Sequence, residues 1–159
     1  MSSIFERAAK VGKVVARTPF LDVKGIYKVR IDSVRSGENQ SHQNYVAIDV
    51  EIKEFQCPDP NAKFLVGETR SIMASEPKDR KHEGTFYNTL VTWGVQIARA
   101  LWAQGGKEGP EPKAEDIDAN ILQALFGPES LLVNKELTVE AMPRQTKNGA
   151  TVYNYVFSV

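Results

Sequence analysis

Residues 45–53 read YVAIDVEIK, in which apolar side chains alternate with polar or charged ones. Because successive side chains of an extended chain point to opposite faces, this alternation predicts a β-strand over 45–55. Its inward positions are Val46, Ile48, Val50 and Ile52. Its outward positions are charged and include Asp49, Glu51 and Lys53. The stretch therefore predicts a strand with one face in a core and the other in water.

Two more strands are predicted on either side of this one along the chain. Residues 25–34, GIYKVRIDSV, alternate in the same way, with Tyr27, Val29 and Ile31 on the inward side. The polar segment 35–44 has the Gly, Asn and Ser content of a loop. After Pro58 and Pro60, which cannot lie in a central strand, a third strand is predicted over roughly 65–74.

The period of the pattern changes in the second half of the chain. From Thr85 the apolar residues recur about every 3.6 positions, which predicts a helix that ends at Gly105-Gly106. A second helix is predicted over 114–126. The final residues form two alternating segments around Asn148-Gly149, a dipeptide typical of two-residue hairpin turns.

This order of three strands, two helices and two strands matches the connectivity of an OB-fold. We therefore predict a mainly β single domain over 1–159, a five-stranded OB-fold barrel with two helices between strands three and four. Residues 1–20 are predicted to form a basic N-terminal arm or helix, and residues 85–127 the helical insertion. A plain α+β sandwich is the alternative fold.

Composition and charge distribution indicate an ordinary globular domain. The chain has no net charge, but residues 1–35 hold eight Lys or Arg against three acids, and a second basic cluster, KDRKH, lies at 78–82. Cys57 is the single cysteine, so an internal disulfide framework is excluded. Neither a secretory signal nor an apolar run of the roughly 20 residues that span a bilayer is found. A cytoplasmic setting is expected.

The closing hairpin carries the aromatic residues of the predicted binding surface. With a two-residue turn, Arg144 lies opposite Tyr153 and Met142 lies opposite Tyr155. The side predicted to face the barrel interior consists of Leu137, Val139, Ala141 and Val156. The outward side then consists of Arg144, Met142, Tyr153, Tyr155 and Phe157, where bases could stack on the rings. The alternative is that these aromatics are core, covered by a helix or by the N-terminal arm.

Cations on the first strand and at the two loops that flank an OB-fold groove are candidates for phosphate contacts. They are Lys28, Arg30, Arg35, Arg144 and Lys147, with Arg7, Lys10 and Lys13 of the arm adding non-specific affinity. Tyr153 and Tyr155 are the predicted base-stacking residues, and Tyr45 and Lys53 are added from the ends of strand two. Because Asp49 and Glu51 repel phosphate, binding is expected at the hairpin and loops.

Four segments resemble the small single-stranded-DNA-binding proteins of tailed bacteriophages. They are GIYKVRIDSV (25–34), YVAIDVEI (45–52), the Trp93-containing NTLVTWGVQIARAL (88–101) and TKNGATVYNYVFSV (146–159). The resemblance implies an OB-fold that coats single-stranded DNA in phage replication or recombination, without catalysis, cofactor or metal ion. It implies single-stranded DNA and phage replication or recombination proteins as partners. The expected setting is the host cytoplasm away from the membrane, and a homodimer is left open.

An enzyme is the main alternative. In a Mg²⁺-dependent nuclease, an acid and a Glu-x-Lys strand hold the metal and polarise water, and Asp32, Glu51 and Lys53 supply these types. Such a match arises easily on a solvated strand face, which is the preferred interpretation. Cys57 has no local pattern linking it to His42 or His82, so neither a Cys-His nucleophile nor a zinc site is predicted. A phage structural or adaptor protein is the third hypothesis, marked by a large apolar patch and no DNA affinity.

Overall fold

The structure, a computed structural model, describes residues 18–56, 65–77 and 83–159. Within these ranges the elements are β1 (Gly25–Glu38), β2 (Asn44–Gln56), β3 (Thr69–Ser75), α2 (Glu83–Gln104), η3 (Ala114–Asp116), α3 (Ala119–Phe126), β4 (Glu136–Gln145) and β5 (Thr151–Ser158). The predicted order of strands and helices is confirmed. The predictions for the N-terminal arm, Cys57, His82 and the basic cluster at 78–82 fall outside the described residues, except for the arm's last three residues.

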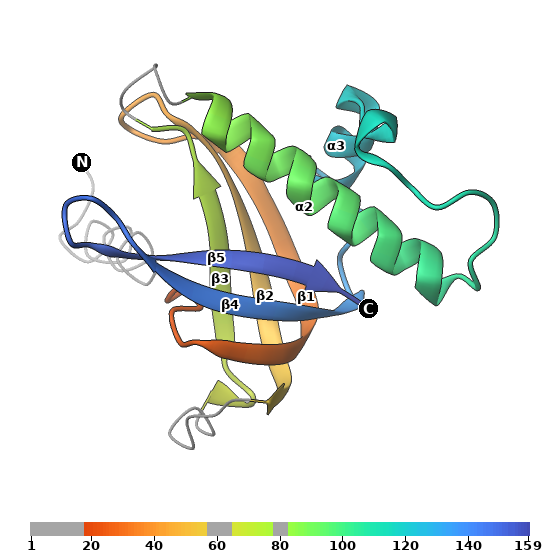
Figure 1. Ribbon diagram of the computed structural model, residues 1–159, viewed down its shortest axis with the longest axis horizontal. Helices are drawn as coiled ribbons and strands as arrows, with labels where there is room; N and C mark the ends of the chain where they lie inside the picture. The colour runs from red at the N-terminus through yellow and green to blue at the C-terminus, as the bar shows by residue number, and fades with distance from the viewer. Residues whose placement is uncertain (1–17, 57–64, 78–82) are drawn as a thin grey trace, which may run out of the picture.

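The five strands form one antiparallel sheet in the order β3-β2-β1-β4-β5. Two register shifts between β1 and β2 leave Asp32 and Lys53 without a direct partner, and such bulges bend a sheet. The sheet curls so that β4 and β5 cross in front of β1, β2 and β3 (Figure 1). The OB-like fold is thus confirmed, but the barrel is not closed, because β3 and β5 are the two edges of the sheet.

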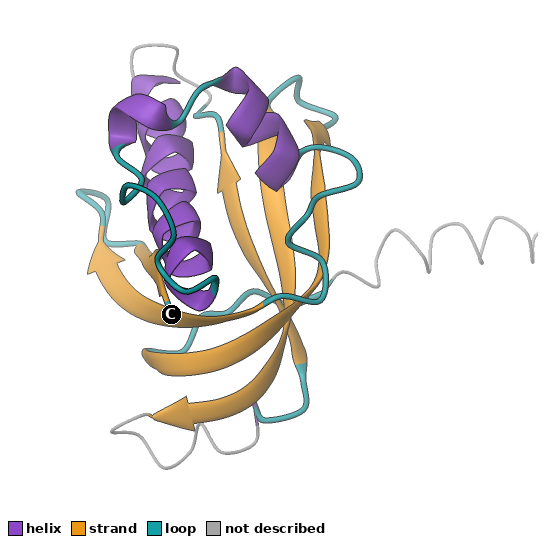
Figure 2. Cartoon of the chain, turned by 90° about the vertical axis from the view of Figure 1, so that its right-hand side faces the viewer, coloured by secondary structure: helices purple, strands orange, loops and turns teal. Residues whose placement is uncertain are grey.

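The core lies between the inner face of the curled sheet and the helices. The alternating sequence pattern forms this core as predicted. The predicted inward residues of β1 and β2 are buried, whereas their charged neighbours are not, apart from Asp49. In Figure 2 the helices gather on one side of the curled strands. Trp93 of α2 packs edge-on against Tyr155 and Phe157 of β5, with ring centroids 6.3 and 5.6 Å away. These aromatic contacts attach α2 to the β5 edge of the sheet.

Two element boundaries differ from the sequence predictions. β1 continues to Glu38, so the first part of the predicted loop 35–44 is strand. The predicted second helix is interrupted before Ala119, because the Asp118 side chain accepts a hydrogen bond from the Ile121 amide and caps the start of α3. Within the described ranges, no helix has the length and apolar composition needed to cross a bilayer.

The predicted register of the closing hairpin is wrong by one residue. Met142 lies opposite Asn154 and Ala141 opposite Tyr155. The turn contains three residues, 147–149, between Thr146 and Ala150, whose backbones are hydrogen-bonded. Gly149 has a φ of 80°, whereas Asn148 is not in the positive-φ region, and a type I′ turn requires both. A type I turn followed by one left-handed glycine adds a residue to the loop and shifts every cross-strand pair.

The shifted register also decides the position of the aromatic residues. Tyr155 and Phe157 share the inner face with Val139 and Ala141, and all four are buried. Tyr155 is 8% exposed, and its hydroxyl donates to the Leu21 carbonyl oxygen at 2.7 Å. The prediction that Tyr155 faces outward to stack on a base is therefore wrong. The alternative, in which Tyr155 and Phe157 are core residues covered by a helix, is confirmed by their contacts with Trp93 of α2.

Candidate nucleic-acid interface

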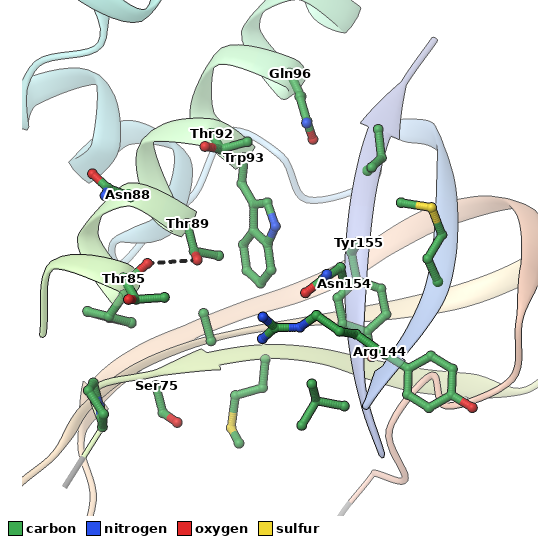
Figure 3. Close-up of a pocket in the computed structure, with 18 residues that line it drawn as sticks. Ser75, Thr85, Asn88, Thr89, Thr92, Trp93, Gln96, Arg144, Asn154 and Tyr155 are labelled. Atoms are coloured by element: carbon green, nitrogen blue, oxygen red, sulfur yellow. Dashed lines mark hydrogen bonds between the residues drawn. The ribbon is translucent and has the colours of Figure 1, made fainter. Parts of the chain in front are cut away.

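A cleft of about 750 Å³ lies where the sheet fails to close. It is bounded by the first half of α2, the end of β3, and the β4–β5 hairpin (Figure 3). Ser75 lies on the β3 side, and Asn154 and Arg144 lie on the hairpin side. Loop 39–43 contacts the chain just beyond β3, where the Gln43 side chain donates to the Glu76 carbonyl oxygen. Glu76 lies between Ser75 and Pro77, which line the cleft, so the β1–β2 loop is next to one end of the cleft and the β4–β5 hairpin forms one of its walls.

The α2 wall of the cleft is polar and uncharged. Its polar lining residues are spaced three or four apart, which places them on one face of the helix: Thr85, Asn88, Thr89, Thr92 and Gln96. Below them, Phe86 and Trp93 close the floor and are almost fully buried. This wall offers hydrogen-bond donors and acceptors without fixed charge.

The opposite wall is an overhanging end of the hairpin. β4 pairs with β1 through Glu136–Ala141, and within the described chain residues 142–145 pair with β5 alone. Pro143 is tolerated at this place because its missing N–H belongs to the side of β4 away from β5, where no strand of the described ranges pairs with it. We refer to residues 142–154 as the hairpin overhang. It brings Arg144, Tyr153 and Asn154 to the cleft.

The cations of the hairpin overhang have no acidic partners in the part of the chain that the structure describes. Among the described residues, neither Arg144 nor Lys147 has a carboxylate within ion-pair distance, and both are exposed. Tyr153 is half-buried and packs against the core on one side while it lines the cleft. Positive charge and an aromatic edge therefore lie side by side at this rim.

The predicted cations of β1 and β2 have different surroundings, because each has a carboxylate partner on the same outer face. Lys28 pairs with Glu54 at 3.8 Å, and Lys53 pairs with Glu51 at 3.1 Å. Arg35 binds Asp49 through two nitrogens, at 2.9 and 3.0 Å. The sequence prediction placed these cations and acids on the same face but did not foresee that they neutralise one another.

Asp49 is the centre of the tightest of these clusters. Although burial raises the pKa of a carboxyl, hydrogen bonds from Arg35, Ser33 and Ser71 lower the pKa of Asp49 below its ordinary value. The hydrogen bond to Asp49 also raises the pKa of Arg35. Asp49 is only 7% exposed and joins side chains from β1, β2 and β3. Its role in the structure is to hold three strands together.

The residues of the nuclease hypothesis belong to the same network. One Arg30 nitrogen donates to Asp32 at 3.1 Å and to Glu51 at 2.6 Å, so a guanidinium occupies the space between the two carboxylates. Lys53 contacts Glu51. In the described portions of the chain, no group of three or more His, Cys, Asp or Glu residues is arranged to hold a metal ion.

The structure separates the predicted binding residues into three groups. Arg144, Lys147 and Tyr153 lie on the hairpin overhang. The outer face of β1 and β2 carries Lys28, Arg30, Arg35, Lys53 and, beside Gly37 at the loop end, Tyr45. Tyr155 is in the core, where burial raises the pKa of its hydroxyl. The sequence prediction missed Asn154 and the polar face of α2, although Thr85, Thr89, Thr92 and Gln96 form a visible row directly beside the apolar stripe of Phe86, Leu90, Trp93 and Ile97.

Comparisons with known proteins add no family assignment, since neither the protein-family models nor the curated proteins contain a match to this chain.

Proposed function

We propose that this protein binds single-stranded DNA without catalysis, in the cleft between α2, the end of β3 and the hairpin overhang. The observation that carries the proposal is Arg144, which has no acidic partner among the described residues and reaches a cleft whose other polar lining groups are uncharged. A cation at the rim suits a phosphate, and uncharged donors and acceptors suit base edges and sugars. This division of chemistry is what a single strand presents, since its bases are free to turn away from its backbone.

The proposed contacts follow from the placement of each group. Arg144 and Lys147 neutralise phosphates at the rim. The half-buried Tyr153 provides a ring edge for a base, whereas Tyr45 lies on the outer face, outside the cleft. Thr85, Asn88 and Gln96 bind bases by hydrogen bonds. No metal ion or cofactor takes part in this mechanism.

The outer face of β1 and β2 makes a smaller contribution in this proposal. Its cations, Lys28, Arg30, Arg35 and Lys53, are matched by carboxylates on the same face. A phosphate approaching them meets the repulsion of Asp49 and Glu51. Each cation that contacts a phosphate adds about 0.7 to the salt dependence of single-strand binding, so Arg144 and Lys147 together contribute about 1.4.

The resemblance to phage single-stranded-DNA-binding proteins supports a role in phage DNA replication or recombination, in the host cytoplasm. Replication or recombination proteins of the phage are the proposed protein partners. The alternative of a phage structural or adaptor protein predicts an assembly interface and no affinity for DNA.

The deciding experiment is a titration with fluorescently labelled oligo-dT and with a duplex of equal length. The oligonucleotide exceeds the roughly 4–16 nucleotides that one OB-fold covers. Titrations at about 50 and about 200 mM salt, with and without Mg²⁺, are expected to show preferential and salt-sensitive binding of oligo-dT and an intact oligonucleotide. Absence of binding to both substrates contradicts the proposal. Mg²⁺-dependent cleavage that disappears in Glu51→Gln indicates the nuclease instead.

A further inference from the structure

The cleft is bordered on one side by backbone groups of β3 that have no hydrogen-bond partner among the described residues. The Glu76 amide donates to the Asn44 carbonyl oxygen, so even-numbered residues of β3 direct their backbone groups toward β2. Odd-numbered residues direct theirs away from the sheet, as Ser71 does when it bonds Pro19 and Leu21. By the same alternation, the N–H and C=O of Met73 and Ser75 point outward from the free edge of β3.

β5 presents the same kind of edge on the other side of the cleft. The Phe157 amide points away from β4, because it donates to the Gln96 side chain of α2 at 2.9 Å. Residues two and four positions earlier share this direction, so the backbone groups of Tyr155 and Tyr153 also point away from β4. Tyr153, Tyr155, Met73 and Ser75 all line the cleft.

Outside the cleft, each edge is covered at one position. Residues 19–21 lie against β3 at Ser71, and the Gln96 side chain covers β5 at Phe157. Proteins usually protect sheet edges because exposed strands pair with other chains. Among the described residues, the outward backbone groups of Met73, Ser75, Tyr153 and Tyr155 have no such cover, and all four residues line the cleft.

The directions of the two strands decide what can fill the gap. Because all neighbours in the order β3-β2-β1-β4-β5 are antiparallel, β3 and β5 run in the same sense. Closing the barrel directly would require one parallel pair. A single inserted strand can be antiparallel to both β3 and β5, so that strand direction keeps alternating around the sheet.

We propose that the cleft accepts an extended peptide from another protein, which pairs with β3 and β5 and completes the barrel as a sixth strand. Backbone hydrogen bonds with Met73, Ser75, Tyr153 and Tyr155 hold the peptide. Its side chains toward α2 are small and polar, to match the uncharged wall, and one carboxylate binds the unpaired Arg144. The peptide fills the space proposed for DNA, so the two ligands compete. This function goes beyond DNA binding and does not depend on it.

The direct test measures binding of a labelled, capped peptide of about seven residues in which Val and Thr alternate around a central Asp. Fluorescence anisotropy without DNA is expected to show saturable binding. N-methylation of alternate peptide amides removes one row of hydrogen bonds and is expected to weaken binding about tenfold. Equal binding of the methylated peptide, or no binding of the parent peptide, overturns the proposal.

Protein variants locate the peptide in the cleft. Ser75→Pro removes an outward N–H at a strand edge, where proline is tolerated, and is expected to weaken peptide binding about fivefold. Ser75→Ala retains the N–H and is expected to lose less affinity. Circular dichroism checks that both variants fold. Equal affinities for the two folded variants contradict the backbone pairing.

Competition distinguishes the two proposed ligands. Unlabelled oligo-dT is expected to displace the labelled peptide, and Arg144→Gln is expected to weaken both. Peptide binding without any DNA binding leaves the sixth strand supported and contradicts the proposed DNA function. DNA binding without peptide binding supports the proposed DNA function and contradicts the sixth strand. Simultaneous binding of both ligands contradicts their shared use of the cleft.

Discussion

The outer face of β1 and β2 and the hairpin overhang carry the same kinds of cation in different electrostatic surroundings. On the outer face, Arg35 and Lys53 each bind a carboxylate from β2. On the overhang, Arg144 and Lys147 have no such partner among the described residues. Beyond Ala141, β4 pairs with β5 alone in the described ranges, so no third strand of those ranges brings acids beside the overhang. The comparison shows that the neighbouring strands, more than residue type, decide whether a cation is available to a ligand.

The largest expected effect is on stability and comes from the outer face. Asp49→Ala leaves Arg35, Ser33 and Ser71 without their shared acceptor and is expected to lower the free energy of unfolding by about 2–3 kcal/mol. Urea denaturation at neutral pH measures the change. The matched control is Glu54→Ala, whose exposed pair with Lys28 is expected to contribute less than about 0.5 kcal/mol. Equal losses in the two variants contradict the distinction between the clusters.

The same cluster has a defined pH dependence. Because folding lowers the pKa of Asp49, its stabilisation is complete above the unfolded-state pKa of about 3.9 and is lost as pH falls through the folded value. The difference in unfolding free energy between wild type and Asp49→Ala is therefore expected to be constant near neutrality and to narrow below about pH 4. Denaturation curves across this range provide the measurement. If the difference in unfolding free energy already narrows between pH 7 and 5, the stabilisation does not come from an Asp49 carboxyl with a lowered pKa.

The next effect is on DNA affinity and comes from the hairpin overhang. Arg144→Gln is expected to weaken oligo-dT binding about tenfold at low salt and to lower the salt dependence by about 0.7. Its stability is expected to stay within about 0.5 kcal/mol of wild type, because the side chain is exposed. Lys28→Gln is the matched control from the outer face, and because Lys28 pairs with Glu54 it is expected to change the DNA affinity and its salt dependence less than Arg144→Gln does. If Lys28→Gln loses more DNA affinity than Arg144→Gln, the outer face and not the hairpin overhang is the main binding surface.

The smallest effect concerns the turn that positions the overhang. Gly149→Ala forces a side chain into positive φ with open space around it, and is expected to cost about 1 kcal/mol from the backbone alone. Asn148→Ala is expected to cost less, since Asn148 does not have positive φ. Thermal denaturation compares the two variants. Equal costs would favour the two-residue turn predicted from the sequence.

The candidate site was predictable in part. The sequence identified Arg144, Lys147 and Tyr153, because a cationic and aromatic hairpin next to an OB-fold loop is a recognisable pattern. It misplaced Tyr155, because the outward or inward assignment depended on a turn length that Asn-Gly allows in two forms. It could not separate Arg144 from Arg35, because availability depends on Asp49, which is brought to Arg35 by strand pairing.

The sequence by itself determined the faces of the strands, the long helix and the OB-like order of elements. Each of these follows from the short-range geometry of the chain, whose periods of 2 and about 3.6 residues appear directly in the spacing of apolar side chains. Only the tertiary structure decided the hairpin register, the ion pairs of the outer face and the gap between β3 and β5. These features depend on the contacts between segments far apart in the chain, which no local period records.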